Sequence, residues 1–110
     1  MSRRLEKVNK NIQKVFARLL QTEADLPAGV LVTVSAVETS PGLRSTDIWL
    51  SVLPPSLEEQ ALAALNSQIY QLQGLLNRQI TINPLPRITL RLDHGFQHAD
   101  HIARTLARLN

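Results

Sequence analysis

Apolar residues recur every three or four positions over residues 2–21, which is the spacing of an amphipathic helix. At 100° per residue they fall within an arc of roughly 100°. The stripe consists of Leu5, Val8, Ile12, Val15, Phe16 and Leu19. One narrow apolar stripe predicts a helix that packs on a core through a single side.

After a loop marked by Pro27 and Gly29, the apolar period changes to two. The stretch "GVLVTVSAVETS" predicts a strand with one shared face, made of Val30, Val32, Val34 and Ala36. "SPGL" is a turn signal. "STDIWLSVLP" predicts a second strand with Ile48, Leu50 and Val52 inward and Asp47, Trp49 and Ser51 outward. The short connection predicts an antiparallel hairpin.

Between residues 57 and 80 the helical period returns without a break, and alone it predicts one helix of about 24 residues. A third strand follows, with Ile88, Leu90 and Leu92 on one face and Arg87, Thr89 and Arg91 on the other. Residues 99–110 predict a short last helix. This order indicates an α+β domain with its helices on one side of a small sheet.

The 110 residues fit one domain, residues 1–110, with 44% hydrophobic and 19% charged residues. The chain has no cysteine, which excludes disulfides and thiolate metal sites and fits a reducing compartment. No apolar run approaches the roughly 18 residues of a membrane span. Net charge is +3 and the pI is about 10.0, which favours a polyanionic partner.

Half of the twelve basic residues fall on one side of the first predicted helix, within about 120°. They are Arg3, Arg4, Lys7, Lys10, Lys14 and Arg18, here called the basic ridge. The ridge suits contact with phosphates, since an ordinary solvent face usually mixes both signs. A merely solvated face stays open as the alternative. A helix lying on a membrane is disfavoured because the apolar side is needed for the core.

The outer face of the predicted sheet gathers Trp49 with Arg87 and Arg91. An aromatic ring beside guanidinium groups can stack single-stranded bases. Alternatively, Trp49 packs against a neighbouring side chain or the end of the chain. One aromatic residue does not decide between them.

The sequence gives little sign of catalysis. His94, His98 and His101 have a spacing that one helix face could use for zinc or nickel, but His94 precedes Gly95, so the three need not align and a solvated helix start is the favoured interpretation. No glycine-rich phosphate loop or nucleophile motif occurs. We expect no enzyme activity, metal or cofactor.

Two stretches carry a family resemblance. "VTVSAVETSPGLRSTDIWLSVLP" resembles the hairpin of the ribosome-binding factor A family of bacterial ribosome-assembly proteins, with matches at Ser40, Pro41, Leu43 and Arg44. "ALNSQIYQLQGLLNRQITINPLPRITLRLD" resembles its later part, through Pro86, the strand and Asp93. The resemblance covers nearly the whole chain.

The resemblance implies a type II KH-like fold, ordered α-β-β-α-kink-α-β plus a short C-terminal helix, with a three-stranded sheet. For residues 57–80 the resemblance implies two helices that meet at a bend near Ser67, whereas the apolar period alone predicts one helix. The family's small Ala-x-Gly is replaced by Gln68-Ile69-Tyr70, so we expect a milder bend. A basic residue of the family is replaced by Gln73, and its Glu by Arg87.

The resemblance further implies a cytoplasmic assembly factor that binds the small (30S) subunit and its 16S rRNA during late maturation and rRNA processing, with links to cold adaptation. We expect a monomer without a membrane or small-molecule partner. The predicted RNA-binding set is the basic ridge with Arg44, Ser67, Arg78, Arg87 and Arg91. A general KH-like RNA-binding module, although no Gly-x-x-Gly loop is present, and a protein-interaction domain without an RNA role remain alternatives.

Overall fold

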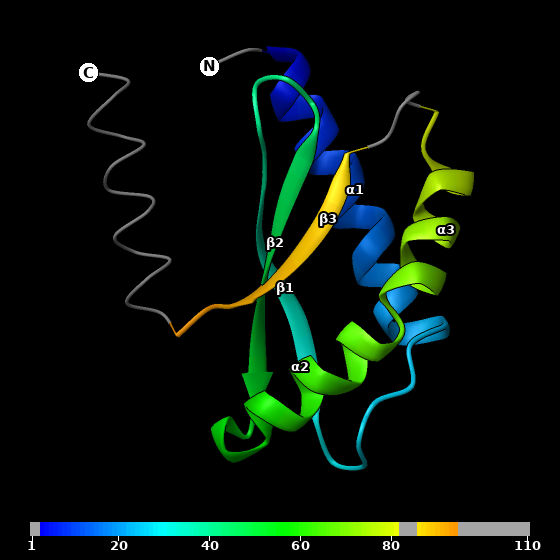
Figure 1. Cartoon of the computed structure of the whole chain (residues 1–110). Helices are drawn as coiled ribbons and strands as arrows, with labels where there is room; N and C mark the ends of the chain where they lie inside the picture. Colours follow the sequence, from blue (N-terminus) through cyan, green and yellow to red (C-terminus); the bar gives the residue numbers. More distant parts are fainter. Residues whose placement is uncertain (1–2, 82–85, 95–110) are drawn as a thin grey trace.

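The computed structural model describes residues 3–81 and 86–94, and three helices lie on one side of a three-stranded sheet (Figure 1). The elements are α1 (Arg3–Thr22), β1 (Leu31–Thr39), β2 (Ser45–Leu53), the 3-10 turn η1 (Pro55–Leu57), α2 (Glu58–Ser67), α3 (Ile69–Gln79) and β3 (Arg87–Leu92). The predicted α+β class and one-sided arrangement are confirmed. The predicted helix over residues 99–110 lies outside the described residues.

The sheet order is β1-β2-β3. β1 and β2 form the predicted antiparallel hairpin, from the pair Leu31–Leu53 to the pair Thr39–Thr46. β3 runs parallel to β2. A parallel partner requires a long crossover, and the α2–α3 pair provides it. Both helices of this crossover therefore return to the same face of the sheet as α1.

β1 does not keep one face throughout its length. Val34 faces inward, but the next paired residue is Ala36, which lies opposite Trp49 on the outer face, so Ser35 is an additional residue. After this bulge Val37 takes the inner position and packs against the core. The prediction that Ala36 shares the face of Val34 was wrong, because one inserted residue shifts the alternation by one.

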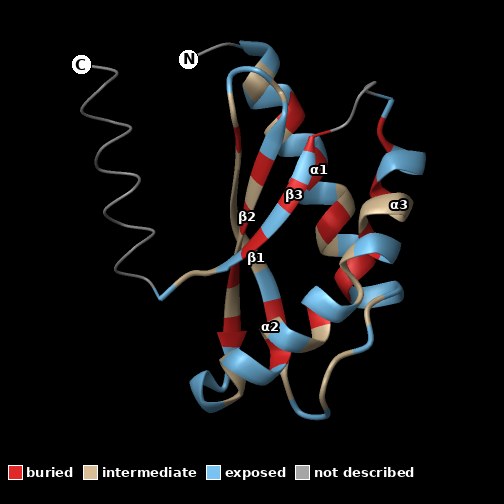
Figure 2. Cartoon of the chain, viewed as in Figure 1, coloured by how far each residue is buried: buried red, intermediate tan, exposed pale blue. Residues whose placement is uncertain are grey.

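The core lies between the helices and the inner sheet face, and buried residues mark one stripe per helix and alternate positions along β2 and β3 (Figure 2). Phe16, the largest fully buried side chain, is central. The helices contribute Val8, Ile12, Phe16, Leu19, Leu20, Ala61, Leu65, Leu72 and Leu76, and the strands contribute Val32, Ile48, Leu50, Val52, Ile88 and Leu90. Each large side chain contributes about 1.5–3 kcal/mol by leaving water.

The central helical segment is broken at Gln68, which has φ −108° and ψ 10° and belongs to neither α2 nor α3. Its N–H donates to the carbonyl of Leu65 at 3.0 Å, and its carbonyl accepts from the N–H of Leu72 at 2.9 Å. The kink near Ser67 is thus confirmed, and the prediction of one continuous helix was wrong. Leu65 and Leu72 are both buried, so the apolar stripe stays in phase across the break and conceals it.

Candidate nucleic-acid interface

All six residues of the basic ridge are exposed, and they lie on the side of α1 opposite its buried stripe. The reason is the amphipathic period: burial of Val8, Ile12 and Phe16 turns the opposite side of the helix to solvent. From Arg3 to Arg18 the ridge spans about 22 Å at 1.5 Å per residue. It offers a rigid row of positive charge with the dimensions of several nucleotides.

The hairpin turn holds Arg44 in a defined position. The Oγ of Ser40 accepts hydrogen bonds from the N–H groups of Arg44 at 3.3 Å and Ser45 at 3.2 Å. Leu43 has a φ of 58° and donates its N–H to the carbonyl of Ser40 at 2.9 Å. A polar serine that satisfies the turn backbone is a common device in tight turns. The Arg44 side chain is exposed beyond this turn.

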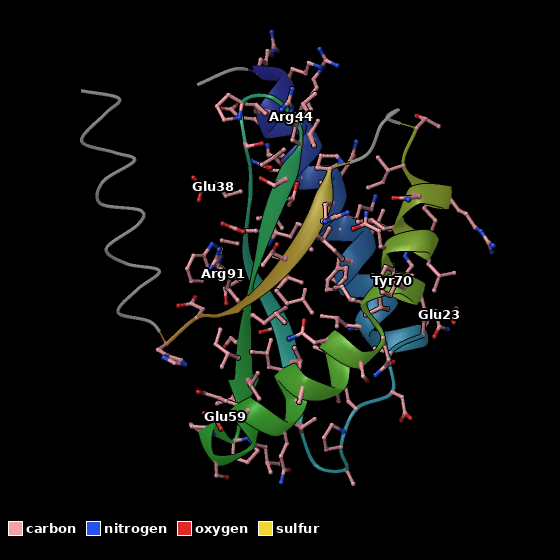
Figure 3. The ribbon with its side chains drawn as sticks, in the orientation of Figure 1. Glu23, Glu38, Arg44, Glu59, Tyr70 and Arg91 are labelled. Atoms are coloured by element: carbon pink, nitrogen blue, oxygen red, sulfur yellow. The ribbon has the colours of Figure 1, made fainter. Side chains whose placement is uncertain are left out.

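Arg87 joins Arg44 at the same end of the sheet. The N–H of Arg87 donates to the carbonyl of Arg44 at 3.1 Å, and both side chains are exposed. The first turn of α1 lies at this end of the molecule as well (Figures 1 and 3). The structure therefore gathers Arg3, Arg4, Arg44 and Arg87 at what we call the basic end. The strand pairing that brings Arg87 to Arg44 could not be read from the spacing of the two residues.

Two further predicted residues, Arg78 and Ser67, lie apart from the basic end, at opposite ends of α3. Arg78 is exposed in the last turn of α3, where a cation also stabilises the helix dipole. Ser67 lies at the kink, at the other end of α3, and its Oγ donates to the carbonyl of Ala64 at 2.6 Å. That hydrogen bond gives Ser67 a local structural role.

The outer face of the sheet is less positive than predicted. Arg91 pairs with Trp49 in the register of β2 and β3, but its Nε lies 3.2 Å from Oδ1 of Asp47. Glu38 lies opposite Asp47 on the same face. The ion pair of Arg91 with Asp47 and the second carboxylate on this face reduce the attraction for phosphate, so this face is a weaker candidate than the ridge.

The sequence did not predict the role of Gln73, whose side chain binds backbone groups at the start of β3. The Oε1 of Gln73 accepts the N–H of Ile88 at 2.9 Å, and its Nε2 donates to the carbonyl of Pro86 at 3.2 Å. Gln73 therefore fixes the start of β3, next to Arg87. Gln73 replaces a basic residue of the family, and in this chain its side chain stabilises the fold. In the sequence, only this departure from the family pattern drew attention to Gln73.

The predicted absence of a metal centre concerns side chains that the structure describes only in part. Within residues 3–81 and 86–94, no three histidine or acidic side chains are placed to hold a metal ion. His94 contacts Glu58 at 2.9 Å, whereas His98 and His101 lie outside those ranges. In the same ranges no helix is long and apolar enough to cross a membrane.

A three-stranded sheet covered on one side by α1 and a kinked helix pair, with a basic ridge on α1, defines a KH-like α+β domain. The sequence profile of the family "Ribosome-binding factor A" matches residues 4–106. The chain therefore belongs to the ribosome-binding factor A family, as the resemblance predicted.

Individual relatives agree with this assignment. Ribosome-binding factor A of Akkermansia muciniphila is 31% identical over 106 residues, covering 96% of this chain and 84% of that protein. That of Natranaerobius thermophilus is 28% identical over 108 residues, covering 97% and 82%. The crystal structure of ribosome-binding factor A from Thermus thermophilus superimposes with a TM-score of 0.71 at 24% identity, covering 80% of this chain and 93% of that one.

A second similar structure is a homology model of the Thermus thermophilus factor, fitted into a cryo-electron microscopy map of a 30S complex. It has a TM-score of 0.65 and 25% identity, and covers 78% of this chain and 91% of that one.

Proposed function

We propose that this chain is a ribosome-assembly factor that binds the small (30S) subunit, contacts its 16S rRNA, and assists late 30S maturation and 16S rRNA processing. One observation of the structure carries the RNA contact: the six basic residues of the ridge are all exposed on a single side of α1. Family membership and the relative fitted in a 30S complex support the choice of the small subunit.

The proposed contact is mainly to phosphates. Lysine and arginine side chains on a helix face bind the backbone of RNA and position the protein without reading sequence. Arg44 and Arg87 extend the contact from the ridge to the basic end, and Arg78 adds a separate contact from the last turn of α3. Ser67 and Arg91 are assigned peripheral contacts, because one is held at the kink and the other is paired with Asp47.

The proposal includes no catalytic step. The factor would act by binding and release, as a monomeric single domain of residues 1–110 in the cytoplasm, without a small-molecule substrate. The family to which it belongs is one of ribosome-binding factors, which supports this role.

Cosedimentation with purified small subunits at increasing salt tests the proposal. We expect the affinity of the wild type to fall steeply with salt, and the triple variant Lys7→Ala, Lys10→Ala, Lys14→Ala to bind more weakly. Loss of three phosphate contacts reduces the slope of log K against log salt by about two to three units. A matched control, Asn11→Ala, Gln13→Ala, Gln21→Ala, removes three exposed uncharged side chains from the same helix.

Absence of binding at low salt, or an unchanged slope in the lysine variant, contradicts the proposal. Equal affinity for short single-stranded RNAs would instead identify a general RNA-binding module.

A further inference from the structure

Tyr70 is the most exposed large hydrophobic residue of the described chain, at 92% of its possible surface. It lies in the first turn of α3, directly after the break at Gln68. Isolated exposed hydrophobic residues are common on proteins and have no meaning alone. Its surroundings give this one significance.

The loop after α1 is fastened to the kink beside Tyr70. The Oε1 of Gln68 accepts the N–H of Asp25 at 2.8 Å, and its Nε2 donates to the carbonyls of Asp25 and Ala64, each at 2.8 Å. Glu23 and Asp25 are exposed on this loop, which the hydrogen bonds between Gln68 and Asp25 hold at the kink, two residues before Tyr70. We call Glu23, Asp25 and Tyr70 the kink corner.

The charge of this corner differs from that of the basic end. The sequence contains no lysine or arginine from residue 19 to 43 or from residue 45 to 77. The nearest basic residue along the chain is Arg18, which belongs to the ridge on α1. The loop, α2 and the first two turns of α3 therefore carry negative charge only, which repels phosphate and attracts cationic groups.

We propose that the kink corner docks a protein segment rich in arginine and lysine. The tyrosine ring accepts a guanidinium or ammonium group over its face, and the two carboxylates accept its N–H donors. The fastening by Gln68 reduces the ordering that such binding requires. The corner thus recognises protein on the side of the molecule away from the basic end. This inference is independent of the RNA contact proposed above.

The test is a titration of the isotope-labelled full chain with an eight-residue peptide of alternating arginine and glycine, followed by NMR. We expect the largest amide shifts at Glu23, Asp25 and Tyr70. Tyr70→Ala combined with Glu23→Gln should weaken binding about three- to tenfold, the sum of one exposed cation–π contact and one exposed ion pair. Tyr70→Phe, which keeps the ring, should bind within about twofold of wild type.

The control is Glu59→Gln, which makes the same change of charge at an exposed position on α2 (Figure 3). Equal weakening by this control would show unspecific attraction and overturn the proposal. Shifts that avoid the kink corner would also overturn it. The proposal would also be overturned if an oligouridine RNA shifted the amide signals of the kink corner at a lower concentration than the peptide does. Tyr70 is nearly free of packing contacts, so its replacement should leave the fold intact.

Discussion

At the scale of single residues, Thr39 and Thr46 form a polar contact inside an otherwise apolar layer. They lie opposite each other near the closed end of the hairpin, with exposed fractions of 5% and 0%. Their Oγ1 atoms are 2.9 Å apart, so one hydroxyl donates to the other. A buried hydroxyl is costly without a partner, and each residue satisfies the other.

We predict that Thr46→Val and Thr39→Val each lower the free energy of unfolding by about 1–2 kcal/mol, because each leaves one buried hydroxyl without this partner. The double variant should lie close to wild type, since valine has nearly the shape of threonine and no polar group then remains. Urea unfolding of the four proteins measures the coupling. Destabilisations that simply add in the double variant would show that the hydroxyls do not depend on each other.

The sequence predicts which residues are buried where the apolar positions repeat with the period of a helix or a strand. Most buried positions of α1, β2 and β3 follow from their spacing, although Leu5, Val15 and Leu92 are only partly buried and the buried Leu20 lay outside the predicted stripe. Gln68 and Gln73 were not predictable in the same way. A glutamine in a helix normally indicates solvent, whereas these two bind backbone groups that lie 43 and 13–15 positions away in the chain. Such partners depend on tertiary structure and leave no mark on local sequence.

At the scale of elements, the α2–α3 break depends on one side chain for its connection to the rest of the molecule. Gln68→Ala removes both hydrogen bonds to Asp25 and one to Ala64. We expect a loss of about 1–2 kcal/mol, less than three full hydrogen bonds, because water replaces those at exposed positions. Amide hydrogen exchange should become roughly 5–30 times faster at Asp25.

Gln71→Ala serves as the control, since Gln71 is exposed on α3 and alanine is the better helix former. Its exchange at Asp25 should equal that of wild type. The same acceleration in both variants would mean that Gln68 does not fasten the loop.

β3 depends on Gln73 in a comparable way. In Gln73→Leu, the amide of Ile88 and the carbonyl of Pro86 lose a partly buried partner, which costs about 1–2 kcal/mol. We predict faster exchange at Ile88 while Phe16 in the core stays protected. Gln79→Leu places the same side chain at an exposed position of α3 and should leave Ile88 unchanged. If the amide of Ile88 still exchanges slowly in Gln73→Leu, then β3 is stabilised by strand pairing alone and does not depend on Gln73.

The order and type of elements were predictable because hydrophobic period and turn residues are local signals. Two irregularities were not. The bulge at Ser35 inserts one residue into a strand that otherwise alternates regularly. The break at Gln68 preserves the phase of the apolar stripe, so only the family resemblance indicated it. The break changes the direction of the helix and the bulge changes the face of the strand, but neither alters the local pattern of residue types.

At the scale of the whole molecule, the arrangement of charge matters more than its sum. The net charge is only +3, yet the basic residues of α1 form one ridge while the chain from residue 45 to 77 has none. A protein with such an asymmetry is oriented by the field of a polyanion before contact. The ridge is therefore expected to act on the rate of association as well as on affinity.

We predict that the association rate constant with small subunits falls with ionic strength, and that Lys7→Ala, Lys10→Ala, Lys14→Ala reduces it most at low salt. The matched control is Ser56→Glu, Gln60→Glu, Ala63→Glu, which lowers net charge by the same three units at exposed positions around α2. Stopped-flow mixing measures both. If position matters, the ridge variant slows by about tenfold or more and the control changes little. Equal slowing in the two variants would mean that net charge alone governs the encounter, and that the ridge does not orient the protein.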